Sequence, residues 1–573
     1  MISRCRWLSH LCLLFTVMAI MACHEESRSN ALKIGLAEEP RTLNIWLASD
    51  ANSRKVLSLI YQPLYIYDPD TLDLVPWLAE SMPMFDEQNL TYTVRLRKAK
   101  WSDGTPFTSL DVAFTGRLIQ SFKVPRYSSK WKFIKQIETP DLHTVVFHLK
   151  KPMASFLTGT LFTPMVQEKE WASVAEKAKT TEKPVAALLN HRVHHPVGTG
   201  PFTLEQWQRG AFLHLKKSSY FFGTGKTING RILGPYVDDL VYTVFGTSDV
   251  AVLALKKGSI DMFWWPIQPG YLADLSRQAD IRLFTNEKSA LYFIGFNLRH
   301  APFDDPALRR AVAYLIDKDF IVSRILQGQG TKMFSVVPAE NRFWYASDLP
   351  RYGDGLSREN RLKTAYRLLS EAGYTWTVPP VDADGDIQPA KAIRLPTGQT
   401  MNRFTILTPP ADYDPHRAIS GLMIQEWLRD LGLPAYARPM AFSSLLQQVK
   451  GNHDFDAFIL GYGRLRLDPG YVRNLFHSSN DKSRGWNMSG YHNPAFDRVA
   501  DRSVTEMDPG KRQVLVKEMQ KMIARDLPYI PLYKPSVVEA VRKDRFDGWV
   551  EMLEGIGNIW SMCQVKPVKH DGA

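Results

Sequence analysis

Few residues of this chain have the types and the spacing that catalysis requires. The run G-T-S at 246–248 begins like the G-x-S-x-G turn that presents a nucleophilic serine, but Val250 stands where the second glycine is needed. No H-E-x-x-H sequence, the pattern of a zinc protease helix, occurs in the chain. The carboxylates of Asp103 and Asp111 have simpler roles, in a turn and in a helix cap. We therefore expect that the protein is not an enzyme and has no catalytic residues.

Two clusters have the composition of a metal site without its spacing. Three histidines lie within residues 191–195, but metal ligands must converge in space and two adjacent residues rarely both ligate. Three aspartates lie within residues 382–386 and resemble the start of a calcium loop, whose sixth residue is glycine and whose twelfth is glutamate. Those positions hold Ile387 and Ile393, so a hairpin turn is the better interpretation. We expect no metal site and no cofactor.

Length, composition and charge describe a large globular protein. A chain of 573 residues exceeds what one hydrophobic core supports, so two or three lobes are expected. A hydrophobic content of 45% and a charged content of 23% are ordinary for a globular fold. The formal net charge of +12 is compatible with nucleic acid or an anionic membrane surface as a partner. The basic residues are scattered and form no long run, which favours a soluble basic surface and no nucleic-acid partner.

The N-terminus has the pattern of a targeting segment. Arg4 and Arg6 precede a mostly apolar stretch, 8–22, that is too short to span a bilayer comfortably. The sequence I-M-A-C at 20–23 resembles a lipobox, the cleavage and acylation site of bacterial lipoproteins, with methionine in place of the usual small second residue. We therefore predict a signal peptide at 1–22 and lipidation of Cys23, which would anchor the protein to the membrane. A plain signal peptide or an uncleaved anchor remains the alternative, and each places the mature chain outside the cytoplasm.

The cysteine count indicates that no disulfide framework stabilises the fold. Cys5 and Cys12 lie in the predicted signal peptide, and Cys23 is the predicted lipidation site. Cys563 then has no partner, so stability must come from core burial. Residues 23–30 are polar and are predicted to form a tether.

The elements that would position a binding site are clearest in the stretch from Leu90 to Phe114. Apolar and polar residues alternate over 90–97, which predicts a strand with one buried face. Asp103-Gly104 predicts a tight turn, and Thr108 with Asp111 predicts a capping box at the start of a helix. Further along, we predict a strand at Thr144 to Leu149, an apolar helix at Pro152 to Thr163, and a helix at Pro509 to Asp526.

The same stretch resembles the signature of the family 5 extracellular solute-binding proteins, which carry peptides and nickel to ABC importers. The family pattern is Y-T-V-x-L-R-x-x-x-K-W-S-D-G-x-P-x-T-x-x-D-V. The matching residues in this chain are Tyr92, Leu96, Arg97, Lys100, Trp101, Ser102, Asp103, Gly104, Pro106, Thr108, Asp111 and Val112. Further blocks follow in the family's order, among them G-T-G-P-F at 198–202 and N-M-S-G-Y at 487–491, so that the resemblance covers Ala31 to Trp549.

The resemblance implies an α/β fold of the periplasmic binding protein type, with two lobes built from three domains and a cleft that closes by hinge motion. Lobe I would be discontinuous, lobe II would be inserted within it, and lobe III would follow. The expected boundaries are 31–63, 197–293 and 541–573 for lobe I, 64–196 for lobe II and 294–540 for lobe III.

Candidate ligand-binding residues follow from the resemblance, position by position. Ser49, Asp50 and Ala51 would offer an edge strand to the main chain of a peptide. Aromatic side chains would line the pocket. Two residues of the N-x-S-G-Y block are candidates as well. These further candidates are Tyr127, Trp264, Trp265, Tyr462, Asn487 and Tyr491.

The segment after residue 460 departs from the family pattern where specificity is decided. In oligopeptide and dipeptide carriers, an aspartate three residues before the conserved D/E-P binds the α-ammonium group of the peptide. The residue at that position in this chain is Leu465, three residues before Asp468. Its neighbours Arg464 and Arg466 could instead grip carboxylate or phosphonate groups by bidentate hydrogen bonds, or simply point into solvent.

We therefore predict a substrate-binding lipoprotein of an ABC importer. It would be a monomer that captures peptides or peptide-like solutes and delivers them to the transmembrane subunits of a permease, at the cell surface or in the periplasm. A binding protein for a nickel chelate, an opine or an acidic small molecule is the alternative within transport. An extracytoplasmic sensor that kept the binding fold is the alternative outside it.

Overall fold

The computed structural model describes residues 30–568, so the predicted signal peptide and Cys23 lie outside the described residues. The fold is mixed α/β, as expected. Within residues 30–568, none of the helices combines the length and the apolar character needed to cross a membrane.

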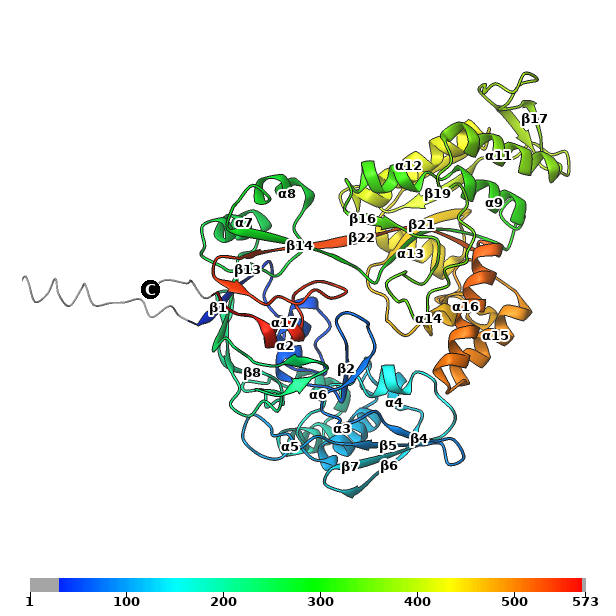
Figure 1. Ribbon diagram of the computed structural model, residues 1–573. Helices are drawn as coiled ribbons and strands as arrows, with labels where there is room; N and C mark the ends of the chain where they lie inside the picture. Colours follow the sequence, from blue (N-terminus) through cyan, green and yellow to red (C-terminus); the bar gives the residue numbers. More distant parts are fainter. Residues whose placement is uncertain (1–29, 569–573) are drawn as a thin grey trace, which may run out of the picture.

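The core of the molecule is a long mixed sheet that runs through both halves of the protein (Figure 1). It contains both parallel and antiparallel pairs, and the segments β14 (Ile281–Glu287) and β16 (Gly330–Lys332) pair with it beside the main path. The main path runs β20 (Ala435–Pro439), β19 (Phe404–Thr408), β21 (Ala457–Tyr462), β15 (Leu291–Phe296), β22 (Tyr529–Arg542), β13 (Met262–Phe263), β1 (Ala31–Leu36), β12 (Asp239–Val244), β9 (Phe212–Lys217) and β8 (Phe202–Gln208).

Strand β22 joins the two halves. Its first part, around Tyr529 to Tyr533, pairs with β15, and its last part, Ser536 to Arg542, pairs with β14. Figure 1 shows this strand passing from the right-hand half to the left-hand half. We call residues 30–287 with 537–568 the N-terminal half, and residues 291–533 the C-terminal half. Among residues 30–568 the chain therefore crosses between the halves twice, at 288–290 and at 534–536, which is an arrangement suited to hinge motion.

Each half buries its own hydrophobic core. The largest cluster contains Leu32, Trp77, Trp101 and Trp560 and draws its buried members from the N-terminal half. The C-terminal half has two large clusters, one on each side of its part of the sheet, and a small third cluster of Ala346, Leu349 and Ala524. Because the cores are separate, the halves can move relative to each other without exposing a shared core.

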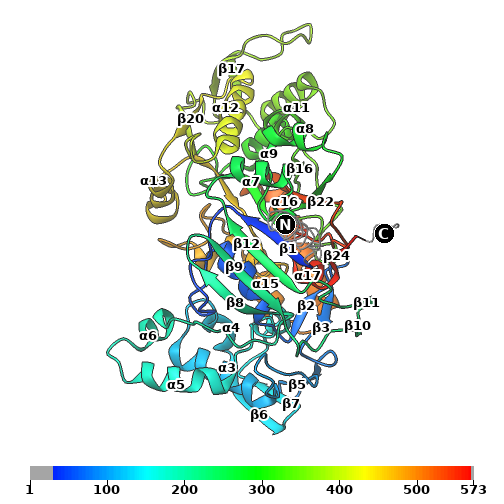
Figure 2. The same cartoon turned by 90° about the vertical axis from the view of Figure 1, so that its left-hand side faces the viewer.

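The N-terminal half carries a second sheet, at the lower end of the molecule in Figure 2, with helix α3 packed on it. The signature stretch forms this region: Thr91 to Arg95 is a strand, and the capping box of Thr108 and Asp111 is present at the start of the next helix, as predicted. The sheet order is β4 (Met84–Asp86), β5 (Thr91–Arg95), β7 (Thr144–Leu149) and β6 (Ile134–Asp141). The helices of this half are α2 (Ala51–Ile60), α3 (Ser109–Phe122), α4 (Ser128–Trp131), α5 (Glu168–Lys179), α6 (Pro184–Asn190), α7 (Ser248–Lys256), α8 (Pro269–Leu275) and α17 (Ile559–Gln564).

The C-terminal half places helices on both faces of its strands (Figure 1). Helix α9 packs on α11, and α15 packs on α16. The predicted helix at Pro509 to Asp526 is confirmed with both its bounds. The helices of this half are α9 (Pro306–Leu315), α10 (Lys318–Phe320), α11 (Arg358–Glu371), α12 (Pro415–Asp430), α13 (Phe442–Leu446), α14 (Tyr471–Phe476), α15 (Pro494–Thr505) and α16 (Pro509–Asp526).

The segment predicted as an apolar helix at Pro152 to Thr163 is largely irregular. It contains a single π-helical turn, Phe156–Thr160. The backbone amides of Met153 and Ala154 bond to Met507 and Val504 of the C-terminal half instead of to a helix of their own. A long-range contact has therefore replaced the helix that apolar composition alone favoured.

The two glycines of the G-T-G motif are required by close packing. A Cβ atom on Gly198 would lie 1.9 Å from the carbonyl oxygen of Ile60, and one on Gly200 would lie 2.0 Å from that of Leu59. The segment thus crosses directly over the end of α2, at a distance that only glycine allows.

Candidate ligand-binding site between the halves

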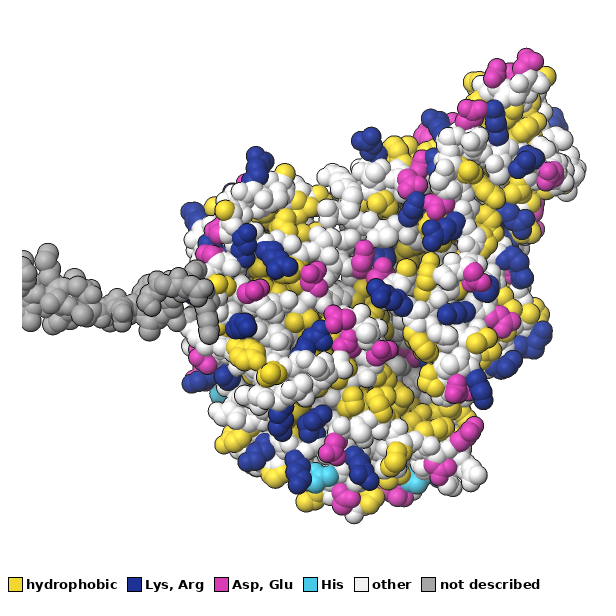
Figure 3. All heavy atoms as spheres, viewed as in Figure 1, with side chains coloured by type: hydrophobic (Ala, Val, Ile, Leu, Met, Phe, Trp, Pro, Cys, Tyr) yellow, Lys and Arg dark blue, Asp and Glu magenta, His cyan; other side chains and the backbone are white. Residues whose placement is uncertain are grey.

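Most of the candidate residues lie on three segments, and a hydrogen bond joins the first two of them. The first is the start of α2, the second is the connection from α3 to α4, and the third is the loop after β21. Arg126 of the second segment donates a hydrogen bond to the carbonyl oxygen of Ala48, just before α2. The halves also meet directly, because the hydroxyl of Thr158 donates to Oδ2 of Asp468 over 2.8 Å. In the space-filling view of Figure 3 the surface is recessed where the two halves meet.

The expected edge strand at Ser49 to Ala51 does not form, and this is a correction to the sequence-based prediction. Asp50 is the N-cap of α2, and its side chain accepts a hydrogen bond of 2.8 Å from the amide of Ser53. Ala51 is already the first helical residue, so its amide faces along the helix axis. The helix cap forms in place of the strand because the aspartate side chain accepts a hydrogen bond from an amide that would otherwise be unpaired at the start of the helix.

Trp264 and Trp265 lie beside a lysine that the sequence analysis did not single out. The ammonium group of Lys55 donates to the carbonyl oxygen of Trp264 over 2.8 Å and lies 4.8 Å from the centre of its ring. The same group lies 5.7 Å from the ring centre of Trp265. Trp264 is only 2% exposed and stacks on Tyr242, whereas Trp265 is partly exposed. Trp264 is therefore a buried residue that packs beneath the surface, whereas Trp265 has surface that a ligand can reach.

Burial and neighbouring charges set the protonation of Lys55. Burial lowers the pKa of its ammonium group to about 8, Glu539 opposes this change, and the cations Arg464 and Lys288 lower the pKa further. Burial raises the pKa of Glu539, and this carboxylate accepts a hydrogen bond of 2.6 Å from the amide of Ile556. Lys55 makes no ion pair within 4 Å among the described residues, although the carboxylate of Glu539 is near.

Tyr127 is enclosed between an aromatic ring and two cations. It is 3% exposed and packs edge-on against Trp46, with ring centres 5.7 Å apart. The cationic groups of Arg126 and Lys130 lie 5.5 and 5.8 Å from the centre of its ring. Burial lowers the pKa of Lys130 to about 8, and the charges of Arg466 and Arg126 contribute to the decrease. The ring of Tyr127 thus holds two basic side chains in place by cation–π contacts.

Leu465 and its two arginines are positioned by the hinge segment. The amide of Leu465 donates to the carbonyl oxygen of Ser289 over 2.5 Å, while its side chain packs against the core of the C-terminal half. Arg464 and Arg466 are both exposed. They act electrostatically across the recess, Arg464 on Arg54 and Arg466 on Lys130.

Asp468 does not compensate these charges, because it is bound elsewhere. Its two carboxylate oxygens accept hydrogen bonds of 2.8 Å each from the guanidinium group of Arg512. Burial raises the pKa of this carboxyl group, but Arg512, the amide of Gly470 and Thr158 together hold it below its usual value. Asp468 therefore serves the structure of the loop.

The remaining candidates have different surroundings. Tyr462 is partly exposed at the end of β21 and stacks on Phe293, so it can present one edge to the recess. Asn487 and Tyr491 are 0% and 3% exposed, and their polar groups are used within the protein: Asn487 bonds to the main chain of Tyr491, and the Tyr491 hydroxyl donates to Asp526. For these two residues the expected ligand contact is replaced by a structural role.

Sequence reasoning missed five basic residues that surround the candidates. Four of them stand within four positions of a predicted residue, and this proximity was an available signal. The fifth lies in the hinge segment, where nothing in its local sequence indicates that it is close to the others. The four are Arg54 and Lys55, which follow Ala51, and Arg126 and Lys130, which flank Tyr127; the fifth is Lys288.

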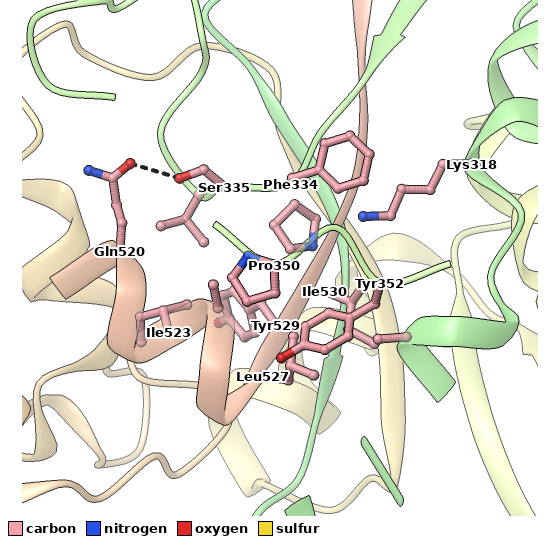
Figure 4. A pocket seen from close by; sticks show the side chains of 14 residues that line it. Lys318, Phe334, Ser335, Pro350, Tyr352, Gln520, Ile523, Leu527, Tyr529 and Ile530 are labelled. Carbon is pink, nitrogen blue, oxygen red and sulfur yellow. Dashed lines mark hydrogen bonds between the residues drawn. The ribbon is translucent and has the colours of Figure 1, made fainter. Parts of the chain in front are cut away.

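Two other features carry no argument for a ligand site. A small pocket in the C-terminal half is lined by Lys318, Phe334 and Tyr352 (Figure 4). Two of its polar side chains are already bonded: Ser335 donates to Gln520 over 2.8 Å, and Lys318 donates to the carbonyl oxygen of Met333 over 2.7 Å. No group of three or more histidine, cysteine or acidic side chains that could hold a metal ion is found between residues 30 and 568.

Comparison with known proteins gives consistent matches over most of the chain. The family model of the bacterial extracellular solute-binding proteins, family 5 (middle), matches residues 73–484. The oligopeptide-binding protein AppA of Bacillus subtilis (strain 168) is 27% identical over 511 residues, covering 88% of this chain and 86% of AppA. The structure of AppA with a nonapeptide superposes with a TM-score of 0.63 at 24% identity, covering 94% of this chain and 99% of that one.

Two further solved structures share the fold. NikZ of Campylobacter jejuni in complex with Ni(L-His) has a TM-score of 0.67 at 21% identity, covering 94% of this chain and 99% of that one. The periplasmic murein tripeptide binding protein MppA, in an unliganded open form, has a TM-score of 0.73 at 18% identity, covering 95% of this chain and 98% of that one. The expected periplasmic binding protein-like architecture is thereby confirmed.

Proposed function

This chain belongs to the family 5 bacterial extracellular solute-binding proteins, and on that premise we propose that it is the substrate-binding component of an ABC importer. It captures a peptide or peptide-like solute between its two halves and delivers it to the transmembrane subunits of a permease. Members of this family are solute-binding transport proteins and not enzymes. The relatives of known name include ABC-transporter peptide-binding proteins, which supports a peptide-like ligand for this chain.

The observation that carries this proposal is the mechanical arrangement of the halves. Two chain segments, 288–290 and 534–536, connect them, and each half has its own core. A solute held between the halves adds contacts that only the closed arrangement makes, so binding shifts the population toward closure. A permease can then distinguish loaded from empty protein by shape.

The division into lobes and the site residues belong to the same proposal. We propose lobe II at 64–196, which includes the four-stranded sheet, and lobe III at 294–540. Because Ser536 to Arg542 pair with β14 of the N-terminal half, the second crossing between the halves lies a few residues before the proposed boundary at 540. Trp265, Tyr462, Arg464 and Arg466 are the candidates with accessible surface at the recess, and these four residues are proposed to contact the ligand.

Lipidation at Cys23 would keep the carrier at the membrane that holds the permease. This part of the proposal rests on the lipobox-like sequence I-M-A-C alone. Cleavage before Cys23 lowers the formal net charge from +12 to +10, because Arg4 and Arg6 are removed. Mass spectrometry of the N-terminal peptide from membranes tests it, and a free N-terminus at another residue would contradict it.

A non-peptide solute is the second candidate within transport. It is favoured by one observation, the leucine at position 465, where a peptide carrier of this family would hold an amine with an aspartate. NikZ, which shares the fold, is described with Ni(L-His), so the fold itself accommodates small chelates in relatives.

Native mass spectrometry of the purified protein with its co-purified ligand tests the proposal. A bound solute of defined mass, together with a decrease in the radius of gyration on adding that solute, is the expected result. A protein that carries no solute, binds none from a peptide library and shows no change in scattering would contradict a role in solute capture.

A further inference from the structure

The recess between the halves gathers basic side chains that lack an ion pair among the residues described, although the carboxylate of Glu539 is near Lys55 and that of Asp50 is near Arg54. Seven of them come from α2, residues 126–130 at the start of α4, the hinge segment and the loop after β21. None makes an ion pair within 4 Å with a carboxylate of residues 30–568, whereas many other basic residues of the protein do. The seven are Arg54, Lys55, Arg126, Lys130, Lys288, Arg464 and Arg466.

Hydrogen bonds bring the four segments together. Arg126 donates to the carbonyl oxygen of Ala48, which joins the α3–α4 connection to the start of α2. The amide of Leu465 donates to Ser289 over 2.5 Å, which places Arg464 and Arg466 beside the hinge residue Lys288. Thr160 donates to the carbonyl oxygen of Lys130 over 2.7 Å, in the same turn from which Thr158 reaches Asp468.

The carboxylates near this cluster are engaged elsewhere. Asp50 caps α2, and Asp468 is bound by Arg512. Glu539 accepts from the amide of Ile556, and Glu554 accepts from the amide of Ser289 over 2.8 Å. Each of these four carboxylates thus has a structural partner, and the basic groups outnumber them.

The cations repel one another across the recess. Burial lowers the pKa of Arg54 first, and the charges of Arg464 and Arg126 lower it further. The Nε atom of Arg54 is buried without a hydrogen-bond partner among the described residues. A buried donor without a partner costs free energy, and like charges held together cost more, so a bound anion would reduce both costs.

We propose that the recess binds a small solute that carries two or more anionic groups, carboxylate or phosphate, rather than a peptide held by its free amine. This inference rests on the solute-binding function proposed above and names the class of solute. Arg464 and Arg466 can each offer a planar pair of donors to one anionic group, and Arg54 with Lys130 can receive a second group from the N-terminal half. The ammonium group of a peptide would lie beside the apolar side chain of Leu465 and would be repelled by the surrounding cations.

The test uses four peptides of one length that differ at two adjacent positions, which hold glutamate, glutamine, lysine or phosphoserine. Isothermal titration calorimetry with the full mature chain measures their dissociation constants at low and high salt. We expect the glutamate and phosphoserine peptides to bind about tenfold or more tightly than the glutamine peptide, and the lysine peptide to bind most weakly. The ratio of glutamate to phosphoserine affinity identifies which anionic group the site prefers, and added salt should reduce both affinities.

A matched pair of double variants separates the site from general charge. Arg464→Gln with Arg466→Gln removes two cations of the recess, and we expect about a tenfold or greater loss of affinity for the glutamate peptide with little change for the glutamine peptide. Arg367→Gln with Arg498→Gln removes two exposed arginines of the C-terminal half that have no ion pair in the described part of the chain, and should leave both affinities unchanged.

Two negative outcomes have different meanings. If the glutamine or lysine peptide binds as tightly as the glutamate peptide, or if the co-purified solute is neutral or cationic, the anionic class is wrong while solute binding stands. If no peptide binds, nothing co-purifies and scattering shows no closure, the proposed function fails and this inference fails with it.

Discussion

Asp468 and Arg512 form a buried two-point ion pair, with hydrogen bonds of 2.8 Å from both terminal nitrogens of the guanidinium group. The pair joins the loop after β21 to α16, and Nε of Arg512 also donates to the carbonyl oxygen of Ser503. Asp468 in addition receives the hydroxyl of Thr158 from the other half. One carboxylate thus organises the loop after β21 and the contact between the halves.

Removing the arginine of this pair should destabilise the protein. Arg512→Gln leaves a buried carboxylate without its cation, and we expect the free energy of unfolding to decrease by about 3–5 kcal/mol. Urea denaturation measures the change. The exposed pair of Lys521 and Asp348 supplies the control, because Lys521→Gln should have no measurable effect. Equal effects of the two substitutions would show that the buried pair has no special importance.

The contact between the halves should contribute modestly to ligand affinity. Thr158→Val keeps the shape of the side chain and removes the donor to Asp468, so closure should lose about 0.5–1.5 kcal/mol and affinity should fall about two- to tenfold. Calorimetry with the co-purified solute gives the value. Thr180→Val is the control, since within residues 30–568 the hydroxyl of Thr180 bonds only to the nearby carbonyl oxygen of Lys177. An unchanged affinity for Thr158→Val would mean that this contact does not depend on closure.

The residue at position 465 should decide whether a free amine is accepted. Leu465→Asp adds a carboxylate between two arginines, so we expect affinity for an acidic peptide to fall about tenfold. Affinity for a peptide with a free amine should rise relative to its N-acetylated form. Leu465→Asn is the matched control, with the same size and no charge. If Leu465→Asp leaves the preference between free and acetylated peptides as it is in the wild type, the absence of an aspartate at position 465 does not explain which peptides are accepted.

Binding of an anionic solute should weaken in alkaline solution. Burial, together with Arg466 and Arg126, lowers the pKa of Lys130 to about 8 in the empty protein, and a bound anion should raise it again. The complex then holds more protons than the empty protein above pH 8, so affinity is constant below pH 8 and falls by up to about tenfold per pH unit above it. Calorimetry in buffers of different ionisation enthalpy should detect proton uptake on binding.

Lys130→Met tests which group is responsible for this pH dependence. The variant should bind the anionic solute more weakly at pH 7 and should show a shallower decrease above pH 8. A wild-type affinity that does not change between pH 7 and pH 9.5 would contradict the assignment.

Lys318 should make the stability of the C-terminal half depend on pH. Its ammonium group donates to the carbonyl oxygen of Met333 and lies 4.3 Å from the ring centre of Phe334. Burial lowers its pKa to about 7, with Asp354 opposing the decrease and Lys332 adding to it. The unfolded chain therefore holds more protons than the folded protein between pH 7 and the ordinary lysine pKa, so this residue makes stability rise with pH in that window.

Lys318→Met removes the titrating group. At each pH, the free energy of unfolding of the variant is compared with that of the wild type. This difference should favour the variant more at pH 6 than at pH 9, by roughly 2–3 kcal/mol. Urea denaturation at both pH values measures this. The exposed Lys482→Met is the control and should show no such separation. Identical pH profiles for Lys318→Met and the wild type would refute the effect.

Local sequence was sufficient for the elements whose signals are local. The capping box at Thr108 and Asp111, the strand at 144–149 and the helix at 509–526 all formed as predicted, because each depends on neighbours within a few residues. The absence of a catalytic motif and the order of the family blocks were also readable from the chain, and so was the leucine at position 465.

The tertiary structure alone decided what lies around that leucine. Asp50 became a helix cap instead of part of an edge strand, because the amides at the start of α2 needed an acceptor. Lys288, Lys55 and Arg464 are far apart in the chain and became neighbours only through the packing of the two halves. Periodicity and spacing report which face of an element is buried, but the distance between charges on different elements is set by long-range packing. The charge of the recess, and with it the class of solute we propose, therefore emerges only in the folded protein.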